Sequence, residues 1–237
     1  MPADVQKLPA QSWLRGFSRA IPITLGYIPV GFAYGVLAQK AGLSAFNVLA
    51  MSIFVYAGSS QLIAVGLFAA QAAPLSIILT TFVVNLRHML MSSALARHLH
   101  RWRKSQLAVF AYELTDETFA LHTVGFPEGD PDFTETLAVN LTAQVSWVFG
   151  SWLGLAAGGL ITDVKPFALD YALPAMFIAL LMIQIKNRTQ VLVALASGVL
   201  AVCLLLTGLG QWYVILATVL GASLGVLLEQ WTKSPSS

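Results

Sequence analysis

The sequence predicts an all-α integral membrane protein, a polytopic helix bundle of about six to eight membrane segments. Hydrophobic residues occupy 57% of the 237 positions and charged residues only 10%, whereas a soluble domain carries about 25% charged residues. The mean hydropathy is +0.74. The charges are also unevenly spread, since none lies within residues 41–86, 136–162 or 189–228. There is too little polar surface to cover a water-soluble globule.

A spanning helix needs roughly 20 apolar residues, and we expect membrane segments at residues 16–39, 45–71, 74–96, 106–124, 136–161, 170–185, 189–207 and 212–228. Each should be helical because a segment in lipid must satisfy its own backbone groups. The strict alternation of a β-barrel strand is not visible. The domain organisation that follows is a cytoplasmic tail at 1–14, one transmembrane domain at 15–231 and a C-terminal tail at 232–237.

Several functional classes are disfavoured by composition. The net charge is only +2, and the basic residues lie in short connectors, which argues against nucleic-acid binding. Cys203 is the single cysteine, so neither a disulfide framework nor a cysteine metal site is expected. The G-x-x-x-x-G-K-[ST] signature is absent, so we expect no bound nucleotide. No cofactor, metal site or removable signal peptide is predicted.

The positions of lysine and arginine predict the orientation but leave two topologies open. Lys7, Arg15 and Arg19 place the N-terminus in the cytoplasm, and the C-terminus is predicted on the same side. If all eight segments cross fully, the basic connector at 97–104 falls outside the cell, against the rule. The conflict disappears if 45–71 and 106–124 are broken or re-entrant segments, which are tolerated where they line a cavity.

Polar residues interrupt the second segment at Val55-Tyr-Ala-Gly-Ser-Ser-Gln61. A helix break here would direct free N–H groups and the positive end of a helix dipole toward a substrate carboxylate. The alternative is that the serines bond to carbonyls one turn earlier while the glycine and the amide serve packing. We favour the break, and the predicted substrate-binding residues are Tyr56, Gly58, Ser59, Ser60 and Gln61.

The third segment carries a polar stripe with helical spacing. Thr81, Asn85, His88 and Ser92 share one face, and polar groups within a span usually face the bundle interior. Asn85 and His88 are therefore candidate substrate-binding residues. The alternative is a position near the membrane edge, with Arg87 extending to the interface. The role of Arg87 stays open.

The fourth segment holds three carboxyl groups. On a continuous helix, the spacing of Glu113, Asp116 and Glu117 puts them on one face. In a low-dielectric cavity they could not all ionise cheaply, so the cluster could exchange a proton or receive a substrate ammonium group. Phe119 follows as a candidate substrate contact. The alternative is a solvated amphipathic helix on the membrane surface.

Glycines recur at four-residue spacing in three segments. The pairs and triplet are Gly31/Gly35, Gly150/Gly154/Gly158 and Gly221/Gly225. Such small-xxx-small faces predict close helix packing and no further role.

Four motifs occur in order along the first half of the chain: Gly26-Tyr-Ile-Pro-Val-Gly-Phe-Ala-Tyr-Gly35, Tyr56-Ala-Gly-Ser-Ser-Gln61, Asn85-Leu-Arg-His88 and Thr115-Asp-Glu-Thr-Phe-Ala-Leu121. Together they resemble the AzlC family, the large subunits of bacterial branched-chain amino acid exporters. The resemblance covers roughly residues 15–121, and the other half agrees chiefly in hydropathy and length. Val30 is a departure, since the family often has phenylalanine there. The resemblance implies the bacterial inner membrane, export of a hydrophobic amino acid and assembly with a small AzlD-type membrane subunit.

A valine-like substrate needs a carboxylate site, an ammonium site and an apolar wall. The break at Gly58 to Gln61 could supply the first, Asp116 or Glu117 the second, and Phe32, Tyr56 or Phe119 the third. Without a nucleotide site, proton-coupled secondary transport is the expected mechanism. Two alternatives stay open: a passive channel or membrane assembly factor, and an intramembrane serine protease that pairs Ser59 or Ser60 with a histidine.

Overall fold

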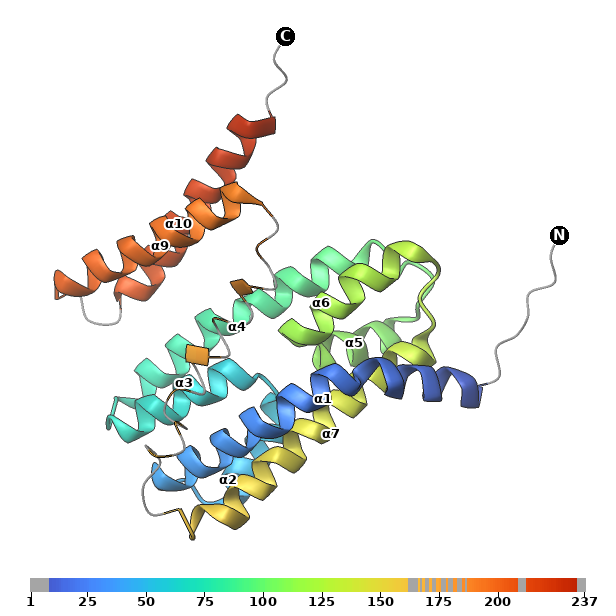
Figure 1. Cartoon of the computed structure of the whole chain (residues 1–237), viewed down its shortest axis with the longest axis horizontal. Helices are drawn as coiled ribbons and strands as arrows, with labels where there is room; N and C mark the ends of the chain where they lie inside the picture. The colour runs from blue at the N-terminus through green and yellow to red at the C-terminus, as the bar shows by residue number, and fades with distance from the viewer. Residues whose placement is uncertain are drawn as a thin grey trace. The chain divides into compact units, whose positions relative to one another are not determined.

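The computed structural model describes residues 9–161, 187–208 and 212–233, with scattered positions between 166 and 185 (Figure 1). The elements in these residues are all helices, which confirms the predicted fold class. The expected segment at 170–185 lies largely outside the described residues. The chain divides into two compact units, Met1–Phe177 and Ile178–Ser237, and each is described by itself.

Two long parallel helices, α1 (Pro9–Lys40) and α7 (Phe133–Gly158), lie side by side in the first unit (Figure 1). Glycines allow their backbones to meet: a Cβ at Gly31 would lie 2.8 Å from the carbonyl oxygen of Trp147, and one at Gly150 would lie 2.6 Å from that of Ile28. The packing role predicted for these glycines is confirmed. α1 begins seven residues before the expected start at 16 and includes part of the expected tail.

The second predicted segment is a broken helix. It consists of α2 (Ala45–Ala50), the π-helix η1 (Met51–Val55) and α3 (Gly58–Ala69). We call this the first hairpin, and residues 56–58 its tip. Asn47 N–H donates to Ser44 Oγ, which caps the start of α2.

The next helix, α4 (Pro74–Ala96), returns to the end of the unit where α1 and α7 begin. The connector after it, residues 97–103, contacts the loop before α7: Trp102 Nε1 donates to the carbonyl of Pro131, and Arg101 pairs with Asp130. We call this end of the unit the connector end. α4 therefore runs antiparallel to α1 and α7.

The fourth predicted segment is also broken, into α5 (Lys104–Glu113) and α6 (Asp116–Gly125), followed by the short 3₁₀ helix η2 (Phe126–Glu128). We call α5 and α6 the second hairpin, and residues 114–116 its tip. The expectation that Glu113 shares a helical face with Asp116 and Glu117 was wrong, because the chain leaves the helix at Leu114 and Thr115. Glu113, Thr118 and His122 are buried, so α5 and α6 each pack one face against the unit and are not solvated on all sides.

The two hairpins enter the unit from opposite ends. The first starts just after α1 ends, where Leu43 N–H donates to the Ala38 carbonyl, and four residues separate its end from the start of α4. The second starts and finishes at the connector end, where Gly125 lies against Arg19. Hence Arg19 and the connector lie at the same end, which removes the conflict between the basic clusters.

The second unit is an antiparallel pair of helices, α9 (Arg188–Leu206) and α10 (Trp212–Lys233). Gly221 faces Ser197, and Gly225 faces Val193, so the predicted packing of this glycine pair is confirmed too. Cys203 is exposed on α9.

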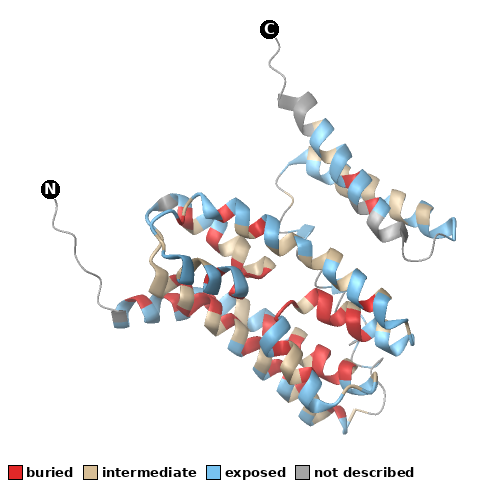
Figure 2. Cartoon of the chain, turned by 180° about the vertical axis from the view of Figure 1, so that it is seen from behind, coloured by how far each residue is buried: buried red, intermediate tan, exposed pale blue. Residues whose placement is uncertain are grey.

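Large apolar side chains cover much of the outer surface, which fits a chain that lies in lipid. Figure 2 shows buried residues concentrated on the inner faces of α1, α7 and the hairpins, and exposed residues on the outer faces. Three described helices are long and apolar enough to cross a membrane, Ala10–Lys40, Pro74–Ala96 and Arg188–Leu206. On α4, Leu79, Phe82 and Leu90 are more than half exposed.

Candidate functional site

The tip of the first hairpin combines an unusual backbone with a new helix start. The π-helix ends at Val55, the next residue, Tyr56, has a left-handed φ of 41°, and Ala57 leads into α3. A left-handed non-glycine residue costs of order 1–3 kcal/mol, and such strain clusters at functional sites. The N–H groups of the first turn of α3, beginning at Gly58, have no partner within the helix and form its positive end. The predicted helix break is thus present.

The tip of the second hairpin starts another helix. Thr115 caps α6 by accepting a hydrogen bond from Thr118 N–H, and the Thr118 hydroxyl accepts one from Thr115 N–H. Asp116 and Glu117 occupy the first turn of α6. Carboxylates are stabilised at this end of a helix by its dipole.

The two tips meet, and a pocket lies between them. Five elements contribute to it, namely α1, both hairpins, α4 and α7. The lining residues are Tyr27, Tyr56, Ala57, Gly58, Ser59, Arg87, His88, Thr115, Asp116, Glu117 and Trp147. The room left for water between these side chains is only about 10 Å³, about what one water molecule requires. A ligand larger than a water molecule therefore does not fit between these side chains as they are placed.

Arg87 connects the two tips. Its Nη1 lies 2.9 Å from Asp116 Oδ2, and its Nη2 donates a hydrogen bond to Ser59 Oγ. The Arg87 and Asp116 side chains are 24% and 15% exposed, so this ion pair is largely withdrawn from solvent. The presence of such an ion pair is weak evidence that it stabilises the fold. Removing one partner, however, strongly destabilises a protein, because the other charge is left uncompensated.

Glu117 is held by α1. The Tyr27 hydroxyl donates to Glu117 Oε2 at 2.5 Å and lies 2.6 Å from Thr115 Oγ1. Arg87 pairs with Asp116, so among the described pocket residues Glu117 is a second carboxyl group without a cation of its own. The pocket thus holds one guanidinium group and two carboxyl groups.

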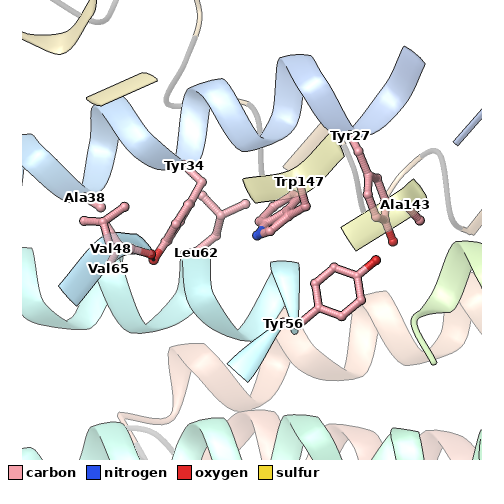
Figure 3. Close-up of a cluster of buried hydrophobic side chains, with 9 residues drawn as sticks. All are labelled: Tyr27, Tyr34, Ala38, Val48, Tyr56, Leu62, Val65, Ala143 and Trp147. Carbon is pink, nitrogen blue, oxygen red and sulfur yellow. The ribbon is translucent and has the colours of Figure 1, made fainter. Parts of the chain in front are cut away.

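Trp147 forms an aromatic wall. Its ring is stacked on Tyr34 with centroids 5.8 Å apart and meets Tyr27 edge-on at 5.6 Å. Figure 3 shows Trp147 between these two tyrosines, with Tyr56 in the same cluster. A Cβ at Gly58 would lie 3.0 Å from Cη2 of Trp147, so the glycine allows the tip to approach the wall.

Several buried polar atoms of the pocket have no hydrogen-bond partner among the described residues. They are the Tyr56 hydroxyl, Arg87 Nε, His88 Nε2 and Trp147 Nε1. Buried polar groups are usually paired, and a concentration of exceptions in one pocket indicates a site for a polar ligand.

Of the predicted substrate-binding residues, Tyr56, Gly58, Ser59 and His88 line this pocket. Ser60 and Gln61 do not: the Ser60 hydroxyl donates to the Ala57 carbonyl, and Gln61 Oε1 accepts from Ala57 N–H. These two side chains hold the tip in place. Among the described residues, neither Ser59 nor Ser60 forms a hydrogen bond with a histidine, so the pairing that a protease would need is not formed.

Four other candidates lie outside the pocket lining. Asn85 has a buried Oδ1 without a partner among the described residues. Phe119 packs beside a separate cluster around Phe110, and Phe32 lies where α1 meets α7. Glu113 is 4% exposed, and its Oε2 also lacks a partner in the described part of the chain.

Sequence reasoning missed Tyr27, Thr115 and Trp147 as site residues and left Arg87 undecided. Tyr27 and Thr115 stand inside the motifs that carry the family resemblance, so their positions contained a usable signal. Trp147 had none, because one aromatic residue in an apolar span is usually packing. Arg87 is partly buried, two to three helical turns before the connector, and its guanidinium has both a carboxylate and a hydroxyl partner.

Comparison with known proteins finds one matching family and several relatives described as membrane proteins. The family described as "AzlC protein" matches residues 22–161. The chain is 30% identical to the inner membrane protein YgaZ of Escherichia coli over 78% of each chain. It is 34% identical to an uncharacterized membrane protein of Archaeoglobus fulgidus, over 92% of this chain and 94% of that one. It is 28% identical to the "Branched-chain amino acid transport protein AzlC" of Bacillus subtilis, over 89% and 82%. No solved structure matches.

Proposed function

The chain belongs to the AzlC family and has a membrane transport role, and from this premise we propose that it exports branched-chain amino acids through the pocket between the two hairpin tips. The family is associated with transport rather than catalysis. The observation that carries the proposal is the meeting of two broken helices at one polar pocket, around the Arg87–Asp116 ion pair. Transporters bind substrates at such discontinuous helices.

The pocket offers the groups that a branched-chain amino acid requires. Arg87 and the first turn of α3 can bind the carboxylate, and Asp116 or Glu117 can bind the ammonium group. Trp147 and Tyr56 supply aromatic surface for the side chain. Ser60 and Gln61 hold the first tip in place through Ala57, and Asn85 is a further candidate on α4, two residues before Arg87, with a buried Oδ1 that has no partner among the described residues.

Proton coupling is part of the proposal. With Arg87 paired to Asp116, the second carboxyl group, Glu117, has no cation among the described pocket residues, and an ionised group of this kind is costly in a membrane interior. We assign the coupling proton to Glu117 in the first instance. Glu113 is the second candidate, since it is buried and one of its oxygens lacks a partner among the described residues.

Counterflow tests the transport function directly. Purified protein in vesicles loaded with unlabelled L-valine is expected to accumulate labelled L-valine transiently, because a transporter exchanges substrate across the membrane. A channel equilibrates the label without an overshoot. Absence of the overshoot for valine, leucine and isoleucine alike would refute the proposed substrate class.

A small membrane subunit of the AzlD type is the proposed partner. We expect it to co-purify with this chain and to raise counterflow when both are present in the vesicles. The proposal of a two-component exporter would be withdrawn if the chain alone purified and transported as well as the pair.

The connector end is proposed to face the cytoplasm in the bacterial inner membrane, with both chain termini on that side. This end of the first unit contains Arg15, Arg19 and the four lysine and arginine residues of 97–104. The positive-inside rule places an end rich in lysine and arginine in the cytoplasm. In a Cys203→Ser background, a cysteine at Ser105 is expected to resist an impermeant maleimide in intact cells. A cysteine at Ala73, exposed at the opposite end, should label.

Both positions are exposed, so accessibility within the fold does not separate them. Ready labelling at Ser105 together with protection at Ala73 would show that the connector end faces away from the cytoplasm.

A further inference from the structure

Arg87 is the group on which the pocket depends, because it binds both tips at once. It reaches Ser59 on the first hairpin and Asp116 on the second. Any substrate that enters must separate these tips, since the room between the side chains is only about 10 Å³. The entering molecule therefore has to replace the contacts of Arg87.

The chemistry of the ion pair restricts what can replace it. A separated guanidinium and carboxylate would each be left as a poorly solvated charge within the membrane, which is strongly unfavourable. A molecule with a single charge would compensate one of them and leave the other unpaired. A zwitterion compensates both and converts one ion pair into two without changing the net charge of the pocket.

The surroundings of the two partners match the two ends of an amino acid. On the arginine side lie the Ser59 hydroxyl and the first turn of α3, whose N–H groups favour an anion. Arg87 Nε is buried without a partner among the described residues, so it can donate a further hydrogen bond. On the other side Asp116 offers only acceptor oxygens, with Glu117 next to it.

We infer that a zwitterionic amino acid exchanges with the Arg87–Asp116 ion pair, so that its carboxylate binds Arg87 and its ammonium group binds Asp116. This inference rests on the proposed transport function and assigns its two charge subsites. The internal ion pair then acts as the selectivity element: it requires both charges of the substrate before the tips can part.

The first test compares three probes of similar side chain on the unmodified protein. L-Valine carries both charges, its amide valinamide lacks the carboxylate, and the keto acid 3-methyl-2-oxobutanoate lacks the ammonium group. Against labelled valine in counterflow, each singly charged probe is expected to compete at least about tenfold more weakly than valine itself. Equal competition by all three would overturn the inference while leaving valine transport intact. Absence of valine counterflow would instead refute the proposed function.

The second test uses crossed variants in the same vesicles. Asp116→Asn leaves Arg87 without its carboxylate, so this variant should shift its preference from valine toward the keto acid by about tenfold or more. Arg87→Gln leaves Asp116 without its cation and should shift its preference toward valinamide. A purely structural ion pair predicts equal losses for all three probes in both variants, and that result would overturn the inference. If either variant does not fold, the competition measured on the unmodified protein still decides.

Discussion

Replacing Gly58 with leucine is expected to abolish transport while the protein stays folded in the membrane. A Cβ at this position would lie 3.0–3.3 Å from three ring atoms of Trp147, and a leucine side chain extends well beyond that. Trp147 cannot retreat easily, because it is held between Tyr27 and Tyr34. Overpacking of this kind costs about 1–3 kcal/mol, and it falls on the tip that lines the pocket.

The measurement is valine counterflow, together with size-exclusion chromatography to show that the protein is intact. Gly66→Leu is the matched control, since it lies on the same helix α3 and a Cβ there meets no atom within 4 Å. Gly58→Ala should give an intermediate loss that Trp147→Phe partly reverses, because the smaller ring makes room for the methyl group. Near-normal counterflow in Gly58→Leu would show that the close approach of the tip to Trp147 is unimportant.

Glu117→Gln is expected to preserve counterflow to within about twofold but to remove efflux driven by a proton gradient. Counterflow needs only substrate binding and reorientation, whereas uphill efflux also needs a group that binds and releases a proton. The amide keeps an acceptor for the Tyr27 hydroxyl but cannot exchange a proton. Tyr27 contacts Glu117 directly, and Asp116, Arg87 and Tyr56 interact with it electrostatically. Glu117 is not a partner in the Arg87–Asp116 ion pair, so the substitution leaves that pair in place.

Measuring each variant in both modes distinguishes the roles of the three carboxyl groups. Asp116→Asn should lower valine transport in both modes, because it removes the partner of Arg87. Glu113→Gln is the comparison variant: loss of gradient-driven efflux there, with Glu117→Gln unaffected, would move the coupling proton to Glu113. If both glutamine variants retain gradient-driven efflux, the coupling group must be sought elsewhere, and His88 is the next pocket residue to test.

The local features of this chain were readable from its sequence. Apolar runs located the described helices, and the interruption at residues 55–61 predicted a break that the structure shows between Val55 and Gly58. The glycine faces at Gly31 and Gly150 were assigned correctly to packing. These features depend on residues close together in the chain, where hydropathy, spacing and backbone freedom act directly.

The composition of the pocket was decided only by tertiary structure. Parallel packing of α1 against α7 brings Tyr27 and Trp147 together, and the opposite entry of the two hairpins brings their tips to that same place. Arg87 lies in the pocket, where it contacts a partner from each tip. Glu113 does not line the pocket, because the helix breaks at Leu114 and separates Glu113 from Asp116 and Glu117. Helical periodicity describes the faces of a single helix, but which faces meet depends on close packing between segments far apart in the chain. That is why the sequence by itself determined the apolar helices and the break before α3, while the break at Leu114 and Thr115 and the charge arrangement of the site were decided only by the tertiary structure.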